Sequence, residues 1–448
     1  KVHDPDAFYH VKMAQIIFGQ GLPDQFPWSF FSVLRDHYVD HHYLFHVILG
    51  PFVYYLGWRG LELFLLFQGL TLFAVTFFLY HVLGLKSKSV FSLIPFIFSA
   101  QFIFAISTGR AIVLSIIFLL SIIIILAKKH FLWLIPAAFF YTLAYNGFPL
   151  MLVLVSFYTI SFLVIEKKFI LKPLLYTMTG ITLGILIHPN FPHNLYFYWV
   201  HIVGIALFPV DIPLGQGWYN YGILKFLQEN WFIFSYYILG AVVFLRSIKD
   251  KYFHPIYLTI FLLSVLFFVA TLRSGIFVFY WVIFSVVFSS IIFKPYLQKI
   301  RWSQLLSVVK KEWLFSVSLI VFASIVFMAA LFSHKDSRDY LSSGQGVYDY
   351  KNASNWLALN SCDEEKVFNP SFDQMPGLFY WNQKNYYVVG LDPTFLYRHD
   401  KNLYWQWHKV AYDSPGQDFS LKDLHDILLN DFDTPYFLDL RPTTGAVF

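Results

Sequence analysis

AIVLSIIFLLSIIIILA, residues 111–127, is the stretch that decides the class of fold. It carries no charge, and a helix of roughly 16–23 such residues crosses a hydrocarbon core about 30 Å thick. The chain as a whole is 57% hydrophobic and only 13% charged, about half the charged fraction of a soluble protein. We therefore expect a polytopic α-helical membrane protein with about ten visible transmembrane helices. The apolar blocks are 61–83, 89–107, 111–127, 131–146, 148–165, 171–187, 231–246, 253–271, 275–293 and 313–333.

Charge divides the chain into two parts. Residues 334–448 hold 10 Lys and Arg against 16 Asp and Glu, which leaves 22 and 11 in residues 1–333, so the net charges are −6 and +11. The two parts therefore face different media. We expect a transmembrane domain at 1–333 and a small soluble α/β domain at 334–448. The stretches 347–360 and 420–431 favour helices, and 367–372, 386–392 and 435–441 favour strands. The segments 372–383 and 390–400 are rich in turn formers and aromatic residues, and we interpret them as turns of this domain, with acceptor contact as the alternative.

Basic residues orient the membrane part. Lys and Arg lie mostly in every second loop between the apolar blocks, and short basic loops stay in the cytoplasm. This places the first loop, residues 1–60, and the C-terminal domain outside, and we expect an integral protein of a prokaryotic inner (cytoplasmic) membrane. The short apolar segment 43–58 contains Gly50 and Pro51, which favours an interfacial or re-entrant helix. Because the chain begins at Lys1 with polar residues, a further membrane helix is expected before it.

Ionisable side chains gather in the first loop. Asp4 and Asp6 flank Pro5, and the extended or turn conformation that a proline favours lets both carboxylates converge on one cation or one acceptor hydroxyl. His42 and His46 have the i, i+4 spacing of a metal-binding pair, but without cysteine ligands zinc is the weaker interpretation. A solvated loop is the alternative. The cluster also contains His3, His10, Arg35, Asp36, His37, Asp40 and His41.

A second polar group follows the block 171–187. The stretch HPNFPHN at 188–194 contains prolines that stop the helix. Aromatic rings can stack on sugars while Asn and His bond hydroxyls, although a plain interfacial loop is equally compatible with this composition. We select His188, Asn190 and His193 as candidate substrate-binding residues. Near them lie His201, Asp211, Gln216, Trp218, Tyr219 and Asn220.

Two runs of the first loop carry a family resemblance. DPDAFYHVKMAQII at 4–17 and DHHYLFHVILGPF at 40–52 resemble the first extracytoplasmic loop of GT-C superfamily membrane glycosyltransferases, most closely the catalytic subunit of oligosaccharyltransferases. The resemblance continues through WRGLELFLLFQGLTLFAVTFFLYHVLG and FIFSAQFIFAISTGRAIVLS, and covers roughly the first 130 residues. It implies that Asp6 corresponds to the catalytic aspartate, which binds a divalent metal (Mg²⁺ or Mn²⁺), with Asp4 beside it. By the same analogy His10, Asp36, Asp40 and His41 line the cavity.

The sequence departs from that family in two places. The second acidic pair is replaced by Ala111-Ile112-Val113-Leu114, which puts a metal site built from two acidic loops in doubt. The nearest string to the family's WWDYG signature is WYNYG at 218–222, in a loop between apolar blocks, and we interpret it as chance. Glycosylation of asparagine sequons is therefore not a safe inference.

Arg110 is a lone cation at a membrane boundary beside Ser107, Thr108 and Gly109. It is suited to clamp the phosphate of a lipid-linked donor, and interfacial snorkelling is the alternative. We expect inverting transfer of a sugar or glycan from a polyprenyl-phosphate-linked donor to a glycan, lipid or protein acceptor at the outer face. Asp6 would orient or deprotonate the acceptor, directly or through the metal, and Arg110 would stabilise the leaving phosphate.

Other functions remain open at this point. A transporter or flippase-like protein with an external binding domain is the main rival, although such proteins usually carry charges near mid-membrane. A membrane polysaccharide polymerase and an assembly factor are further alternatives. Nucleic-acid binding is not expected, because the basic residues lie in short clusters and form no continuous stripe. Cys362 is the single cysteine, which excludes an intrachain disulfide.

Overall fold

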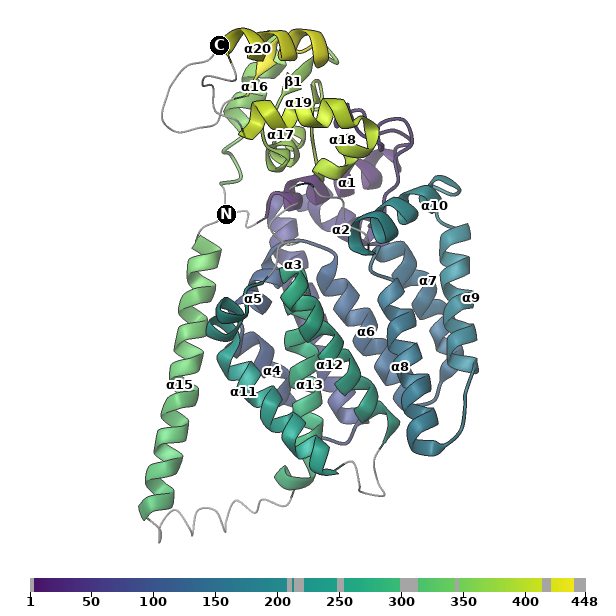
Figure 1. The fold of residues 1–448 in the computed structure, drawn as a ribbon, viewed down its shortest axis with the longest axis vertical. Helices are drawn as coiled ribbons and strands as arrows, with labels where there is room; N and C mark the ends of the chain where they lie inside the picture. The colour runs from purple at the N-terminus through teal and green to yellow at the C-terminus, as the bar shows by residue number, and fades with distance from the viewer. Residues whose placement is uncertain are drawn as a thin grey trace.

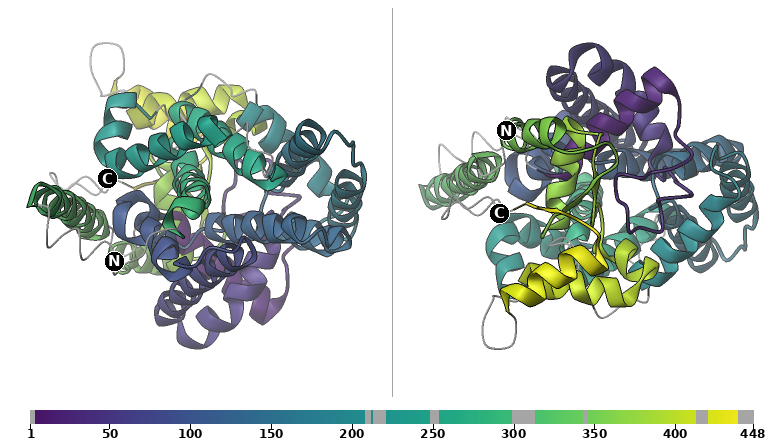
Figure 2. Two further views of the ribbon diagram at one scale, coloured as in Figure 1. Left: turned by 90° about the horizontal axis from the view of Figure 1, so that it is seen from below. Right: turned by 90° about the horizontal axis from the view of Figure 1, so that it is seen from above.

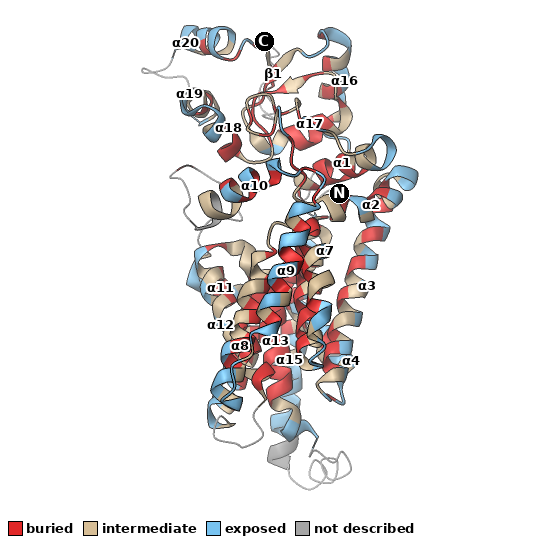
Figure 3. Ribbon diagram, turned by 90° about the vertical axis from the view of Figure 1, so that its right-hand side faces the viewer, coloured by how far each residue is buried: buried red, intermediate tan, exposed pale blue. Residues whose placement is uncertain are grey.

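The computed structural model describes residues 4–207, 212, 221–247, 254–298, 313–342, 346–412 and 420–438. Long helices form a bundle, and shorter helices with a small sheet cover one end of it (Figure 1). Buried residues line the interior of the bundle and exposed ones its outer faces (Figure 3). This arrangement gives the molecule an apolar part with lipid-facing side chains and a polar cap.

Six helices in the described part of the chain are long and apolar enough to cross a membrane, or seven if a bent pair is one span. Every predicted apolar block coincides with a helix or with this pair, but three other apolar helices are shorter, so the count of ten spans stays a prediction. The long helices are α3 (Trp58–Val82), α8 (Pro149–Glu166), α11 (Ile223–Ser247), α12 (Pro255–Arg273), α13 (Val278–Leu297, preceded by a 3₁₀ turn) and α15 (Trp313–Ser342). The three shorter apolar helices are α2 (Tyr43–Leu56), α6 (Ile112–Ala127) and η1 with α7 (Phe131–Trp133 and Leu134–Ala144). α9 (Lys172–Leu186) covers the block 171–187.

The predicted block 89–107 is not one straight helix. It is divided into α4 (Lys88–Phe98) and α5 (Ala100–Ser107), whose axes differ by 86°. Ser99 adopts an extended conformation between them, and its Oγ accepts the Phe102 N–H at 3.2 Å, which begins α5 afresh. Conversely, α2 runs through Gly50 and Pro51 without interruption and ends at Gly57.

α13 is the most buried of the long helices and α15 the most exposed. In the span that includes α13, 78% of the apolar window is buried, because α11 and α12 pack on it. In α15 only 11% is buried, and Figure 2 shows this helix at the periphery in both end-on views. Apolar side chains such as Ile320, Phe322 and Phe327 are exposed along it, as expected of a helix that faces lipid. α15 also continues past residue 333 to Ser342, so the predicted domain boundary falls inside a helix.

The C-terminal part contains the predicted mixture of strands and helices. Three short parallel strands form a sheet in the order β2-β1-β3. The strands are β1 (Lys366–Phe368), β2 (Tyr386–Tyr387) and β3 (Tyr436–Phe437), and the helices are α16 (Lys351–Asn360), α17 (Met375–Trp381), α18 (Pro393–His399), α19 (Lys401–Tyr412) and α20 (Leu421–Asp426). The segments 372–383 and 390–400, interpreted as turns, contain α17 and α18 instead. Whether this part is an independent domain stays a prediction.

The first loop joins the C-terminal part closely. The Phe30 N–H donates to Tyr387 O and the Tyr387 N–H donates to Trp28 O, each at 2.9 Å, so the loop extends the edge of the sheet. Phe8 of α1 (Asp6–Gln20) packs edge-on against Tyr350 and Tyr380. These contacts fix the start of α1 between the bundle and the sheet, where the charged residues of the first loop lie.

Candidate active site

Asp4, Asp6 and Arg110 form one ionic cluster at the end of the bundle that carries the sheet. The guanidinium of Arg110 lies 2.7 Å (Nε) and 2.8 Å (Nη2) from the two oxygens of Asp4, and its Nη2 lies 2.8 Å from Asp6 Oδ2. The Asp6 N–H donates to Asp4 Oδ1 at 2.9 Å, so Asp4 also caps the start of α1. The two carboxylates converge on the guanidinium of Arg110.

Gly109 allows the turn between α5 and α6 to reach α1. Its φ is +72°, in the left-handed region that favours glycine. A Cβ at this position would lie 3.4 Å from both Ala7 Cβ and Leu61 Cδ1. The backbone therefore approaches α1 closely and delivers the next residue, Arg110, to the carboxylates.

The surroundings raise the pKa of Asp6 to about 7. Burial is the largest cause; Arg110 acts in the opposite direction, and the carboxylates of Asp4, Asp373 and Asp392 raise the pKa further. The Asp6 side chain nevertheless keeps 32% of its surface exposed. A carboxylate that is accessible and titrates near neutral pH can exchange a proton with a bound molecule.

Asp373 and Asp392 were missed by sequence reasoning. They lie in segments that were interpreted as ordinary turns of the C-terminal part, although both act electrostatically on Asp6. The pKa of Asp373 is raised by burial and by Asp4. Because these residues follow Asp6 by several hundred positions, no local signal links them to it.

Beside this cluster, Asp40, His46 and His10 form a buried chain of hydrogen bonds. His46 Nδ1 lies 2.7 Å from Asp40 Oδ2, and His46 Nε2 lies 2.8 Å from His10 Nδ1. A carboxylate accepts, so His46 Nδ1 donates to Asp40, and His46 Nε2 shares the next hydrogen bond with His10 Nδ1. Burial lowers the pKa of His10 well below its usual value. The chain orients His10, four residues after Asp6 on α1.

His41 and His42 extend the histidine cluster. Their rings lie 3.9 Å apart, and His42 also packs on His10 and Tyr145. Burial lowers the pKa of both residues well below the usual value, so both are neutral at pH 7. His41 Nδ1 and His42 Nδ1 are buried without a hydrogen-bond partner. Buried unpartnered nitrogens are uncommon and give this end of the bundle unused polar groups.

Only some residues of the second polar group, 188–194, support Asp40 in the first loop. Asn190 Oδ1 accepts the Asp40 N–H at 3.1 Å, and His188 Nδ1 accepts the Asn190 N–H at 3.1 Å, so these two residues position Asp40. His193 instead stacks on His37, with ring centroids 4.1 Å apart. Both line a separate cavity of about 230 Å³.

Asp36 is not brought into the cluster: its side chain is 73% exposed and lies 3.6 Å from Arg35 Nε. His201 joins through its ring contact with His41 and its 2.8 Å hydrogen bond with Asn146 Nδ2. Other residues considered in the sequence, His3, Asp211, Gln216 and 218–220 of WYNYG, lie outside the described residues.

The divalent metal implied by the resemblance does not fit this arrangement. Asp4 Oδ1, Asp4 Oδ2 and Asp6 Oδ2 all contact the Arg110 guanidinium. Among the described residues, no group of three or more His, Cys, Asp or Glu is arranged to hold a metal. The His42–His46 pair is equally unsuited to zinc, because both ring nitrogens of His46 are engaged with Asp40 and His10. The family resemblance implies a metal, but these side chains are already engaged with one another.

An apolar groove lies near Arg110. It holds about 440 Å³ and is lined by α3, α4 and α5, among them Leu66, Gly69, Phe96 and Ser107. Ser107, one of the lining residues, precedes Arg110 by three positions. The volume and the apolar lining of the groove suit a hydrocarbon chain.

Comparison with known proteins places the fold. No protein-family model matches the sequence, and no curated protein sequence matches it either. Solved structures of the oligosaccharyltransferase of Archaeoglobus fulgidus are similar in three dimensions. The apo crystal structure superposes with a TM-score of 0.63 at 9% identity and covers 86% of this chain and 61% of its own.

Two further structures of that enzyme superpose similarly. The form tethered to an acceptor peptide with the NVT sequon gives a TM-score of 0.59 at 10% identity, covering 87% of this chain and 60% of its own. The complex with an inhibitory peptide and a dolichol-phosphate gives 0.63 at 9% identity, covering 86% and 60%. The chain therefore has a fold like that of this oligosaccharyltransferase, spans about 60% of the length of these enzymes, and is an integral membrane protein.

Proposed function

We propose that this chain is a membrane glycosyltransferase that transfers a sugar or glycan from a polyprenyl-phosphate-linked donor to an acceptor at the extracytoplasmic face. The observation that carries the proposal is the cluster of Asp4, Asp6 and Arg110 at one end of a GT-C bundle. A carboxylate that titrates near pH 7 lies there within 2.8 Å of a fixed guanidinium. Transfer to a nucleophile from a phosphate leaving group needs both groups.

Asp6 and Arg110 have separate roles in the proposed step. The acceptor nucleophile attacks the anomeric carbon and gives its proton to the Asp6 carboxylate. The bond from the anomeric carbon to the phosphate oxygen breaks, and the electron pair stays on that oxygen. Arg110 stabilises the charge that develops on the phosphate. Attack opposite the leaving group inverts the anomeric centre, and no metal enters this scheme.

The lipid-linked donor is supported by the groove beside the Arg110 turn. Its lining is almost entirely apolar and it opens on the surface of the bundle, as suits an isoprenoid chain whose phosphate reaches Arg110. A similar structure was solved with a dolichol-phosphate. His10, His41, Asp40, His188 and Asn190 then shape the cavity around the sugar.

The C-terminal part supplies the acceptor side in this proposal. Asp373 and Asp392 approach Asp6 from that part, and a similar structure was solved with a tethered acceptor peptide. The acceptor can be a glycan, lipid or protein, and a polysaccharide polymerase differs only in this choice. We place residues 334–448 outside the membrane, with the transmembrane domain at 1–333 in a prokaryotic inner membrane.

A donor panel tests the function. Purified protein in detergent is incubated with polyprenyl-phosphate and polyprenyl-diphosphate sugars, and donor consumption is followed by chromatography. The parent should consume at least one donor, and Asp6→Asn should lower the rate by about 10²–10⁴-fold, the usual contribution of a general base. The matched control is Asp426→Asn, an exposed carboxylate on α20 paired with His425, which should leave the rate unchanged.

Two outcomes would contradict the proposal. Equal rates for the parent and Asp6→Asn, with both variants folded, would remove Asp6 from the reaction. Transfer of an intact donor across a vesicle membrane without cleavage of the sugar–phosphate bond would favour the flippase-like alternative.

A further inference from the structure

The two carboxylates expected to hold a metal have little coordination capacity left. Arg110 contacts both oxygens of Asp4, at 2.7 and 2.8 Å, and one oxygen of Asp6, at 2.8 Å. Asp4 Oδ1 also accepts the Asp6 backbone N–H. A divalent cation bound to the two Asp4 oxygens and to Asp6 Oδ2 would have to displace the guanidinium, which is a planar donor well suited to two neighbouring carboxylates.

The neighbouring chain offers no replacement ligands. The positions after Arg110, where the resemblance would put a second acidic pair, are Ala111, Ile112 and Val113, and each is at most 2% exposed. Ile112 and Val113 are the first residues of α6, Ala111 precedes them, and all three are buried. The loss of the acidic pair and the presence of a bridging arginine are independent observations that agree.

We propose that Arg110 takes the place of the divalent metal in this chain, so that a guanidinium holds Asp4 and Asp6 in position. This inference rests on the proposed function for its catalytic consequence, but the cation that binds the carboxylates can be determined without any reaction. The same arginine would also face the donor phosphate, so one residue joins the acceptor-activating carboxylate to the leaving group.

The charge of the cluster is consistent with this replacement. One guanidinium opposes two carboxylates, with Asp373 and Asp392 adding negative charge nearby. A divalent ion would balance the first two carboxylates fully and hold Asp6 ionised. With Arg110 alone the site keeps an excess of negative charge.

Manganese binding provides the test. Electron paramagnetic resonance of Mn²⁺ is recorded on the purified full chain in detergent at pH 8, for the parent, Asp6→Asn and the control Asp426→Asn. All three should bind the same small amount of Mn²⁺. If Asp6→Asn binds at least about tenfold less tightly than the parent, Asp6 is a metal ligand and the proposal is wrong.

Chemical rescue adds the catalytic consequence. Arg110→Ala should transfer slowly, and added guanidinium ion should raise its rate by about tenfold while Mn²⁺ should not. Rescue by Mn²⁺ alone would overturn the proposal. Thermal melting of each variant verifies that it is folded. If the parent consumes no donor, the proposed function fails, but the Mn²⁺ measurement still decides which cation the carboxylates hold.

Discussion

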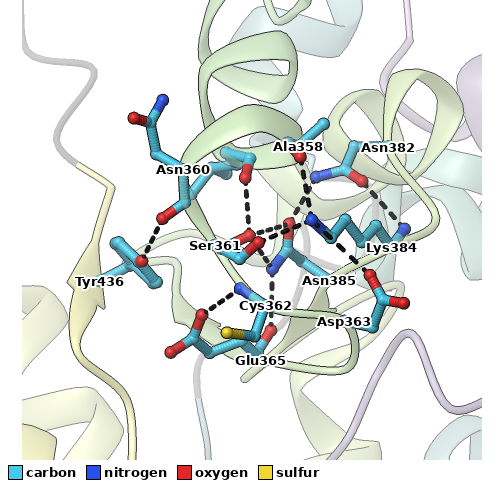
Figure 4. Close-up of polar contacts among 11 residues, drawn as sticks. Ala358, Asn360, Ser361, Cys362, Asp363, Glu365, Asn382, Lys384, Asn385 and Tyr436 are labelled. Atoms are coloured by element: carbon cyan, nitrogen blue, oxygen red, sulfur yellow. Dashed lines mark hydrogen bonds and ion pairs between the residues drawn. The ribbon is translucent and has the colours of Figure 1, made fainter.

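Two cations tie distant segments of this molecule together. Arg110 joins the turn before α6 to Asp4 and Asp6 at the start of α1. Lys384, just before β2, joins its strand to the end of α16: its Nζ donates to Ala358 O at 3.0 Å and Ser361 O at 2.6 Å and lies 3.6 Å from Asp363 (Figure 4). Both cations bridge long separations in the sequence.

The partners of the two cations differ in kind. Lys384 satisfies backbone carbonyls that a helix end leaves free, so its contacts complete a fold. Asn385 completes the same network by donating to Ser361 Oγ at 2.7 Å and Glu365 O at 3.1 Å. Arg110 instead faces more carboxylates than it can balance, and one of them titrates near pH 7. The two cations have similar numbers of contacts but differ in charge balance, and we expect chemistry at Arg110, where the carboxylates outnumber the cation.

The largest effect is expected at Arg110. Arg110→Gln should lower the transfer rate by about 10²–10³-fold, because it removes the charge that stabilises the leaving phosphate. Arg110→Lys keeps the charge but loses the planar fork that reaches two carboxylates, and should retain more activity. Initial rates at saturating donor measure this. Arg398→Gln is the matched control, because its guanidinium is exposed and donates to the backbone oxygen of Gly204 at 3.4 Å.

Lys384 should affect stability without affecting chemistry. Lys384→Met removes two charge-assisted hydrogen bonds to carbonyls and should lower the free energy of unfolding by about 1–3 kcal/mol. Thermal melting in detergent measures the loss, with Lys422→Met on exposed α20 as control. The transfer rate per folded molecule should stay at the parent value; a large drop would mean that Lys384 also belongs to the reacting site, and the comparison would fail.

The sequence predicted the parts of this site that depend on neighbours in the chain. Apolar blocks mark the helices because burial in lipid acts on each segment separately. Pro5 between Asp4 and Asp6 indicated that the two carboxylates converge, and Arg110 was selected from its place at a membrane boundary. The bend at Ser99 was missed, because one polar residue in an apolar block does not reveal that it caps a new helix.

The pairing within the site could not be predicted in the same way. Asp4 and Arg110 are 106 positions apart, and they meet because α1 packs against α2 and α17 while the Gly109 turn approaches Ala7. Asp373 lies just before α17, and the contact of Phe8 with Tyr380 on α17 follows no helical or strand period. Asp36, four positions before Asp40, points to solvent because its backbone lies in an irregular loop without a predictable face.

The pH dependence should separate the two regions further. Asp6 acts as a base only when ionised, and its pKa is about 7, so the rate should rise about tenfold per pH unit below 7 and level off above it. Because Arg110 lowers the pKa of Asp6, Arg110→Gln should move the midpoint to higher pH. Lys384→Met should leave the midpoint unchanged. Rate profiles between pH 5 and 9 measure all three.

The same pKa predicts the sign of a stability change. Between the usual value of 3.8 and about 7, the folded state binds more protons than the unfolded state. The contribution of Asp6 to stability is therefore fully present at low pH and is lost as pH rises through 7. Asp6→Asn should flatten this slope in melting temperatures recorded over the same pH range, and an unchanged slope would contradict the raised pKa.

The smallest effect is expected for the carboxylate beside Lys384. Asp363 is 87% exposed and lies 3.6 Å from Lys384 Nζ, and exposed pairs of this kind contribute less than about 1 kcal/mol. Asp363→Asn should therefore leave the melting temperature nearly unchanged, because the two carbonyls still hold the lysine. A loss as large as that of Lys384→Met would mean that charge balance stabilises this region as well. Charge balance with a carboxylate would then matter at both cations, for stability at Lys384 and for the reaction at Arg110. Only the rate measurement on Asp6→Asn would still distinguish the two cations.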